Sequence, residues 1–266
     1  FVPILGSKPE ALGRPFNEVW KEAWSEISAI ADAAFAGEAT YIENFPLMIE
    51  RSQQPERAYF TFCYSPIRDS HGAVVGMLDT VTETTATVYM TQRLAVLDGI
   101  GHAVANATDA QEILATTMQM LAQHLHVTHC AYAEMEADQD AFFIRDNWLS
   151  EGATTIVGQY SLADFGQQAA SQLQAGKPLV INDVVKEFSA QDAASFTALG
   201  VKATICLPLI KGGRLTALMA IHDRSPRQWS VHELALLREV TERSWAHIER
   251  ARADASVREG LLELAQ

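Results

Sequence analysis

The sequence contains few cysteines and few basic residues, and each shortage excludes a class of protein. Cys63, Cys130 and Cys206 are odd in number and far apart, which fits neither a disulfide framework nor the paired spacing of a structural zinc site. Lys and Arg number 20 against 33 Asp and Glu, giving a formal net charge of −13. A surface this acidic repels nucleic acid and anionic membranes. We therefore expect buried, reduced thiols and no nucleic-acid partner.

Long apolar runs are also missing. No stretch approaches the roughly 20 residues that a membrane-spanning helix needs, and the chain opens without a charged, apolar, small-residue leader. We expect a soluble, cytoplasmic protein with no membrane partner. Hydrophobic residues make up 48% of the 266 residues, which is enough for two cores of ordinary domain size.

The first third of the chain has the pattern of a helix followed by strands. Apolar residues recur at three- and four-residue steps over 15–35, which predicts an amphipathic helix that ends at Gly37. A polar turn at 68–72 separates two strand-like segments, 59–67 and 74–82, and predicts a β-hairpin. Aromatic residues alternate with small ones in its first strand, so one face of the hairpin should be apolar.

The remaining two thirds alternate helical and strand-like segments. A helix is predicted over 84–106, and Thr108 or Asp109 could cap the next one. Ser230 is the predicted cap of a long final helix. Between these helices lie two predicted hairpins (130–136 with 142–149, and 204–210 with 215–222), one further strand (178–184) and two short helices (161–174 and 190–199).

Local phrases in the first part resemble the C-terminal portion of a PAS domain. They are LGRPF at 12–16, YFTFCYSPIRD at 59–69 and VTETT at 81–85. The resemblance implies that the opening strands of that fold would precede Phe1, so we expect an incomplete PAS pocket.

The second part resembles a GAF domain. The resemblance rests on CAY at 130–132, PLVINDV at 178–184, and the hairpin that runs from ICLPLI at 205–210 to His222. Together the two resemblances imply an α+β protein with a truncated PAS-like antiparallel sheet, a linker helix, and a GAF domain whose central antiparallel sheet is flanked by helices. The expected boundaries are 1–86 for the PAS part, 87–108 for the linker helix, 109–250 for the GAF domain, and 251–266 for an outgoing signalling helix.

GAF domains hold small ligands between the sheet and the loops over it, so strand faces supply the candidate binding residues. The candidates are Tyr132, Trp148, Tyr160, Phe165, Asp183, Thr204, Cys206 and His222. The alternative interpretation is that the aromatic residues are core and that Asp183 caps a loop. His124, His126 and His129 lack the carboxylates or cysteines that would complete a metal site, so we expect neither a metal nor a catalytic site, and the sequence identifies no cofactor.

The resemblance implies a regulatory input module of signal transduction, of the kind found in sensor histidine kinases of two-component systems. The chain has neither a phosphoacceptor helix nor a Gly-rich ATP lid, so it is expected not to be an enzyme itself. Two alternatives stay open. A chromophore-binding photoreceptor could attach a tetrapyrrole at Cys130, although the Asp-Ile-Pro phrase of such domains is missing. A free methionine sulfoxide reductase would need Cys130 and Cys206 to lie near each other.

The predicted helices at 84–106 and from Ser230 onward carry apolar stripes, which suggest a parallel homodimer and a route for the signal through the outgoing helix. The residues expected in this seam are Leu94, Leu97, Ile100, Val104, Leu237, Val240 and Trp245.

Overall fold

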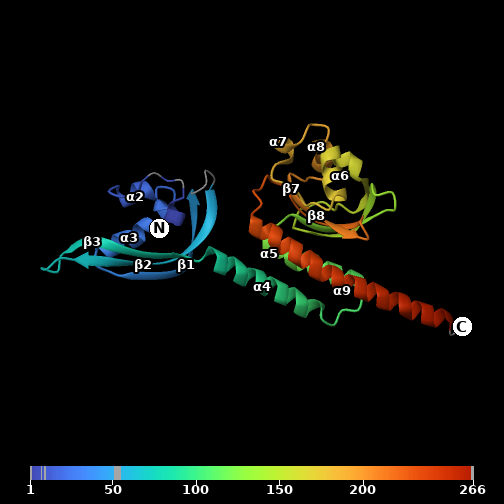
Figure 1. Cartoon of the computed structure of the whole chain (residues 1–266), viewed down its shortest axis with the longest axis horizontal. Coiled ribbons are helices and arrows are strands. Elements are labelled where there is room, and N and C mark those ends of the chain that lie inside the picture. The colour runs from blue at the N-terminus through green and yellow to red at the C-terminus, as the bar shows by residue number, and fades with distance from the viewer. Residues whose placement is uncertain (1, 7, 9, 51–54, 265–266) are drawn as a thin grey trace. The chain divides into compact units, whose positions relative to one another are not determined.

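The computed structural model describes residues 2–6, 8, 10–50 and 55–264, and the chain divides into two compact units, Phe1–Gln92 and Arg93–Gln266. Figure 1 shows the elements of each unit. Helices and antiparallel sheets occur together, which confirms the predicted α+β class. No helix in the described part of the chain combines the length and the apolar composition needed to span a membrane.

The first unit packs helices on one face of an antiparallel sheet of order β1-β2-β3. The helix predicted over 15–35 is in fact two, because residues 20–23 form turns. Trp20 and Ala23 within this break are both buried. The helical spacing of apolar residues therefore continues across the break, which is why the sequence predicts a single helix. The elements are α1 (Val2–Leu5), α2 (Phe16–Val19), α3 (Trp24–Phe35), β1 (Thr40–Glu50), β2 (Pro55–Arg68) and β3 (Val74–Glu83).

The predicted hairpin is confirmed as β2 and β3. Asp69 closes its turn by accepting hydrogen bonds from the backbone N–H groups of His71 and Ala73, at 2.8 and 2.9 Å. Gly72 takes the left-handed conformation that the turn requires, with φ of 86°. The aromatic face is buried under α2 and α3, with Phe60 and Phe62 each 3% exposed.

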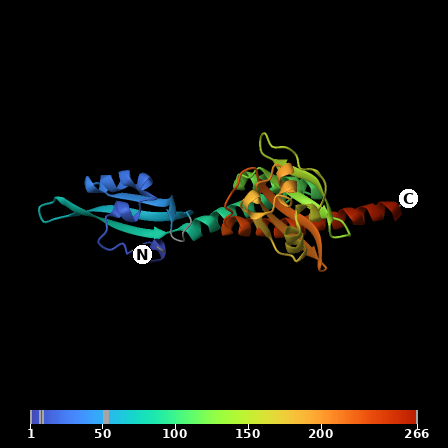
Figure 2. The ribbon, with the colours of Figure 1, turned by 90° about the horizontal axis from the view of Figure 1, so that it is seen from above.

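The second unit is built on a sheet of order β6-β5-β4-β9-β8-β7 within the described residues. Helices α5 and α9 cover one face, while η1, α6 and α8 cover the other (Figures 1 and 2). The elements are α5 (Ala110–Leu125), β4 (His129–Met135), β5 (Ala141–Leu149), β6 (Gly158–Ser161), η1 (Leu162–Phe165), α6 (Gln167–Gln174), β7 (Leu179–Ile181), α7 (Val184–Glu187), α8 (Ala193–Ala198), β8 (Ala203–Lys211), β9 (Arg214–Asp223) and α9 (Val231–Leu264).

Polar side chains start the two long helices of this unit at the predicted residues. Asp109 caps α5 by accepting a hydrogen bond from the backbone N–H of Gln111, at 3.1 Å. At the start of α9, the Ser230 hydroxyl accepts from the N–H of Glu233, and the Glu233 carboxylate accepts in turn from the N–H of Ser230. This reciprocal pair is a capping box, and it fixes the point at which α9 begins.

The apolar stripes proposed for a dimer seam are mostly covered within the chain itself. Helix α4 (Thr85–Val104) crosses the boundary between the two units, and its residues from Leu97 on pack into the second unit. Leu97, Ile100, Val104, Leu237 and Val240 are each at most 5% exposed, Trp245 is half-buried, and only Leu94 of the seven residues is largely exposed, at 55%.

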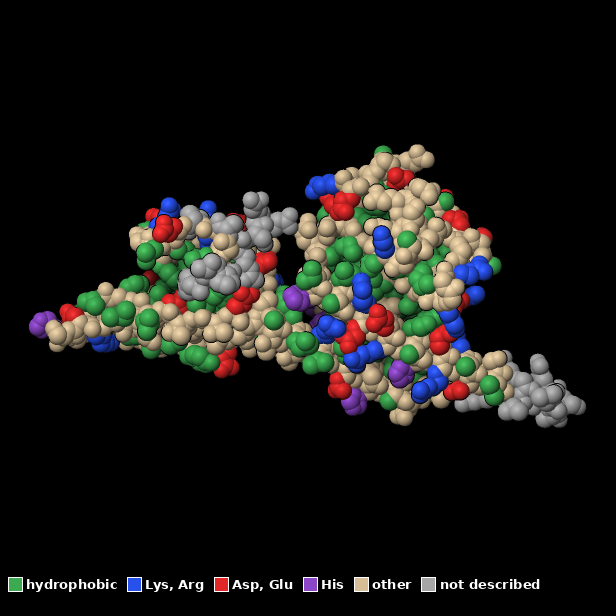
Figure 3. Space-filling model, viewed as in Figure 1, with side chains coloured by type: hydrophobic (Ala, Val, Ile, Leu, Met, Phe, Trp, Pro, Cys, Tyr) green, Lys and Arg blue, Asp and Glu red, His purple; other side chains and the backbone are tan. Residues whose placement is uncertain are grey.

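The basis for the seam was therefore wrong, because α4, α5 and α9 cover one another's stripes. The surface of α9 visible in Figure 3 carries charged side chains of both signs. Some of them are in ion pairs: Glu239 pairs with Arg93 and Arg243, and Lys211 with Glu249. Dimerisation stays a prediction, and these buried residues do not support it.

The hairpin of β8 and β9 provides a test of the core. Met219 is 1% exposed and packs toward α5 and α9, whereas Leu209 is only half-buried. We expect Met219→Ala to lower the free energy of unfolding by about 2–5 kcal/mol, through lost burial and the cavity left behind. Leu209→Ala should cost clearly less. Urea denaturation of both variants measures the difference, and equal losses would contradict the difference in burial between the two residues.

Candidate functional site

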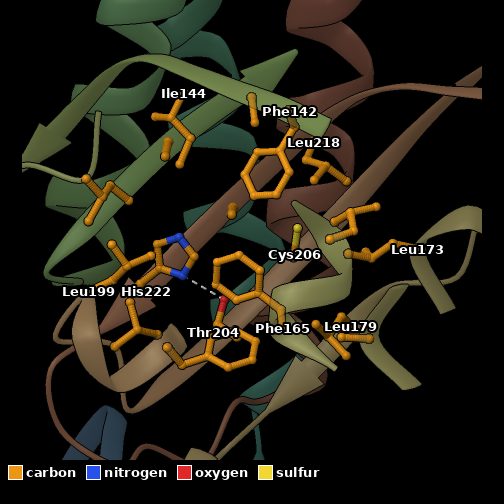
Figure 4. Close-up of a pocket in the computed structure, with 18 residues that line it drawn as sticks. Phe142, Ile144, Phe165, Leu173, Leu179, Leu199, Thr204, Cys206, Leu218 and His222 are labelled. Atoms are coloured by element: carbon orange, nitrogen blue, oxygen red, sulfur yellow. Dashed lines mark hydrogen bonds between the residues drawn. The ribbon is translucent and has the colours of Figure 1, made fainter. Parts of the chain in front are cut away.

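A cavity of about 70 Å³ lies in the second unit, between the sheet and the layer formed by η1, α6 and α8. Figure 4 shows its walls, which come from β4, β5, β8 and β9 on one side and from the covering helices on the other. Its lining is almost wholly apolar. The residues are Ala131, Ala133, Phe142, Ile144, Ile156, Leu162, Phe165, Ala169, Leu173, Leu179, Phe196, Leu199, Val201, Thr204, Cys206, Leu218, Ala220 and His222.

The sequence creates this space by placing small side chains at the centre of the sheet. Ala131 and Ala133 of β4 and Ala220 of β9 face the cavity, and strands β4 and β9 are neighbours. The rings of Phe165 and Phe196 lie across from them, with centroids 4.9 Å apart in an edge-to-face arrangement. Because alanine side chains are short, the rings cannot close the gap without moving their helices, and a cavity remains.

The polar groups of the cavity wall meet at one point. The Thr204 hydroxyl donates a hydrogen bond to the backbone carbonyl of Ile221 at 3.1 Å, and its oxygen lies 2.8 Å from Nδ1 of His222 (Figure 4). A hydroxyl has a single proton. We assign that proton to the bond with the Ile221 carbonyl, which makes Nδ1 of His222 the donor to Thr204 and leaves Nε2 with its acceptor lone pair.

The imidazole of His222 is held neutral by its surroundings. Burial lowers the pKa of His222 to about 3, and the ring of His129, whose centroid is 6.3 Å away, adds to the effect. A neutral ring with Nδ1 protonated presents Nε2 as a hydrogen-bond acceptor. Thr204 and His222 are therefore the polar pair in an otherwise apolar lining.

Cys206 also faces the cavity, and Cys130 lies on the opposite face of the sheet. They sit on β8 and β4, which flank β9, and they pair with the successive residues Ala220 and Ile221. Successive residues of a strand point to opposite faces. Burial raises the pKa of each thiol to about 12, so both stay protonated and weakly nucleophilic.

The structure brings together only some of the residues predicted for the site. Phe165, Thr204, Cys206 and His222 line the cavity, and Tyr160 packs behind Phe165 with its hydroxyl donating to the carbonyl of Ile156 at 2.9 Å.

Three of the predicted residues lie elsewhere. Tyr132 and Trp148 pack on the face covered by α5 and α9, because Tyr132 follows Ala131, whose side chain faces the cavity. Asp183 precedes α7, where an ion pair with Lys186 at 3.0 Å holds the pKa of its carboxyl below the usual range. It occupies the N-cap position of α7, and the backbone N–H groups of Lys186 and Val185 also help to lower its pKa.

Of the three clustered histidines, His129 makes a polar contact outside the cluster. Nε2 of His129 lies 2.9 Å from the backbone carbonyl of Thr154. Within the described residues, no group of three His, Cys, Asp or Glu side chains is arranged to hold a metal ion.

Comparison with known proteins identifies the second unit. The family model described as the GAF domain matches residues 109–248. No curated protein matches the chain.

Solved structures share the fold at low sequence identity. The phycocyanobilin-bound GAF domain from a cyanobacterial phytochrome is 18% identical, with 61% of this chain and 96% of that chain covered and a TM-score of 0.53. The phycoerythrobilin-bound GAF domain from a cyanobacterial phytochrome is 17% identical, with 62% and 99% covered and a TM-score of 0.54. The chromophore-binding domain of a bacteriophytochrome from R. palustris is 10% identical, with 79% and 76% covered and a TM-score of 0.53.

The tautomer of His222 can be tested directly. We expect long-range ¹H–¹⁵N NMR spectra to show a neutral ring protonated at Nδ1 that does not titrate between about pH 5 and pH 8. The lowered pKa also determines how the free energy of unfolding depends on pH. The stability that depends on neutral His222 is present above the pKa of histidine in the unfolded chain and is lost as the pH falls toward 3. A charged ring, or one protonated at Nε2, would contradict the assignment.

Proposed function

The chain belongs to the GAF domain family, and on that premise we propose that it is a sensory input module. A small uncharged molecule binds in the cavity of the second unit, and binding is relayed through the sheet to α9. The observation that carries the proposal is the apolar cavity, whose lining includes the neutral imidazole of His222 in hydrogen-bond contact with Thr204.

The chemistry of the wall defines the ligand class. Charged ligands are disfavoured because no Lys, Arg, Asp or Glu lines the cavity within the described residues. A cavity of about 70 Å³ admits a molecule of a few heavy atoms. One N–H or O–H donor on that molecule would satisfy Nε2 of His222, and Phe165 and Leu218 would contact its apolar surface. The ligand is therefore small, neutral and apolar, with a single donor.

Strand β4 offers a short route from the cavity to α9. Ala131 and Ala133 face the cavity, while Tyr132 between them faces α9, where its ring centroid is 6.0 Å from that of Trp245. Arg252, further along α9, forms an ion pair with Glu134 at the end of the same strand. A ligand that presses on the two alanines moves the strand, and these contacts carry the movement to the helix.

The output of the module is a change in a domain or partner that α9 controls. A histidine kinase of a two-component system is the class that the sequence resemblance suggests for this role. The described part of α9 extends beyond the sheet (Figures 1 and 2), which suits a helix that passes a shift onward. In this proposal the chain itself binds and relays, and does not catalyse.

The geometry argues against both alternatives raised by the sequence. The cavity is far smaller than the roughly 300–1,000 Å³ of pockets for larger ligands, so a linear tetrapyrrole would require the helical layer to move. Cys130, the residue proposed to attach it, faces the opposite side of the sheet. A sulfoxide reductase needs two thiols that can form a disulfide, but Cys130 and Cys206 face opposite sides of the sheet.

Pyrrole and furan form a matched pair of probes for the cavity, since they are close in size and only pyrrole has an N–H donor. We expect saturable shifts of the amide signals of β8 and β9 with pyrrole and about tenfold weaker binding of furan, the value of one hydrogen bond. His222→Phe should abolish the preference, and the exposed His247→Phe should keep it. Equal binding of both probes to the unsubstituted protein would refute the donor requirement.

The relay is tested by Tyr132→Ala. We expect this variant to bind pyrrole as before, because Tyr132 lies outside the cavity, but to lose the ligand-dependent change in amide hydrogen exchange along 240–257 of α9. Arg145→Ala, at an exposed residue that also pairs with Glu134, is the matched control and should keep the change. An unaltered response in Tyr132→Ala would show that the signal takes another route.

A further inference from the structure

One acidic side chain interrupts the apolar face of the sheet in the first unit. Phe60, Phe62 and Tyr64 of β2 lie on this face, and Val81 of β3 stands opposite Phe62. Two residues earlier on β3, Asp79 stands opposite Tyr64 and so points to the same face. A carboxylate in this layer is costly unless something pairs with it.

Asp79 has no such pair in the described part of the chain. Its Oδ1 is buried and accepts no hydrogen bond. Burial raises the pKa of Asp79 to about 6, and no neighbouring cation acts to lower it. The carboxylate is thus charged near neutral pH, and one of its oxygens is held out of water without a partner.

The surroundings of Asp79 are aromatic. A small cavity of about 30 Å³ lies between the sheet and the helices, and Asp79 lines it together with Phe16, Trp20, Phe60 and Tyr64. The Phe16 and Tyr64 rings meet edge to face, with centroids 5.9 Å apart. Aromatic faces attract cations through their quadrupole, and they do so more strongly where water is excluded.

An ammonium group of the chain already lies close to this cavity. Nζ of Lys8 lies 3.8 Å from the centroid of the Trp20 ring, where it donates to the Val19 carbonyl at 3.1 Å and pairs with Glu22. Lys8 therefore pairs with Glu22 and not with Asp79. Its position shows that the Trp20 ring accommodates a primary ammonium.

We propose that the cavity between the sheet and helices of the first unit binds a primary ammonium group on a short alkyl chain, with Asp79 as its counter-ion. The ammonium donates to the orphaned Oδ1, and the rings of Phe60 and Tyr64 enclose the alkyl carbons. A bulky quaternary ammonium is too large for this space. The site is separate from the cavity of the second unit and needs no part of the function proposed there.

Propylammonium and propan-1-ol, similar in shape but different in charge, test this site in the full chain. We expect saturable shifts of the amide signals of 62–64 and 79–81 with propylammonium and none with propan-1-ol. Asp79→Asn should bind propylammonium at least about tenfold more weakly, because a charge-assisted hydrogen bond is lost. Asp32→Asn makes the same chemical change at an exposed carboxylate of α3 and should bind as the unsubstituted chain does.

Stability separates a binding role from a structural one. Asp79→Asn should raise the melting temperature at neutral pH and not at about pH 4, because the raised pKa means that the charged form opposes folding as the pH rises through about 6. In the unsubstituted chain, propylammonium should also lower the pKa of Asp79, which the ¹³C shift of its carboxyl carbon reports independently of any variant. Equal responses to propan-1-ol, or an Asp79 carboxyl unaffected by propylammonium, would overturn the proposal.

Discussion

The second unit depends on how its two central strands divide their side chains between the faces of one sheet. On β4 and β9, the side chains that face the cavity include Ala131, Ala133, Ala220 and His222, while Tyr132, Met219 and Ile221 face the other side. The large residues hold α5 and α9 tightly. The small ones leave a cavity under α6 and α8. The same alternation therefore produces both the cavity and the packing contact with α9, on opposite faces of the same strands.

This arrangement explains why the polar pair Thr204 and His222 can sit in an apolar wall. The Thr204 hydroxyl contacts both the Ile221 carbonyl and Nδ1 of His222, so the wall carries a neutral polar pair and, within the described residues, no charged side chain. A neutral polar pair costs less to bury than an ion and still selects among ligands by direction. If the proposed function holds, such a pair would add specificity without loss of core stability.

Much of the architecture could be predicted from the sequence because it rests on local signals. Asp109, the Ser230–Glu233 pair and the turn closed by Asp69 are short-range hydrogen bonds, and both late hairpins follow from turns between alternating strands. The site was predicted only in part. Phe165, Thr204, Cys206 and His222 were found, but Tyr132 and Trp148 were assigned to the wrong face, since the sequence gives the period of a strand and not which face meets the cavity.

Other residues of the cavity could not be predicted from the sequence at all. Ala131, Ala133 and Ala220 shape the cavity by being small, and an alanine carries no chemical signal that marks a site. The buried stripes of α4 and α9 were taken for exposed ones, because periodicity shows that a face is apolar and leaves open which neighbour covers it.

The central claim is that the filling of the cavity is felt by α9, and Ala131→Leu tests it without any ligand. The larger side chain occupies the space that a ligand would take. The account predicts that amide hydrogen exchange along 240–257 of α9 changes in this variant in the same direction as it does in the unsubstituted chain with pyrrole. Changes confined to α6, α8 and the cavity lining, with α9 unaltered, would contradict it.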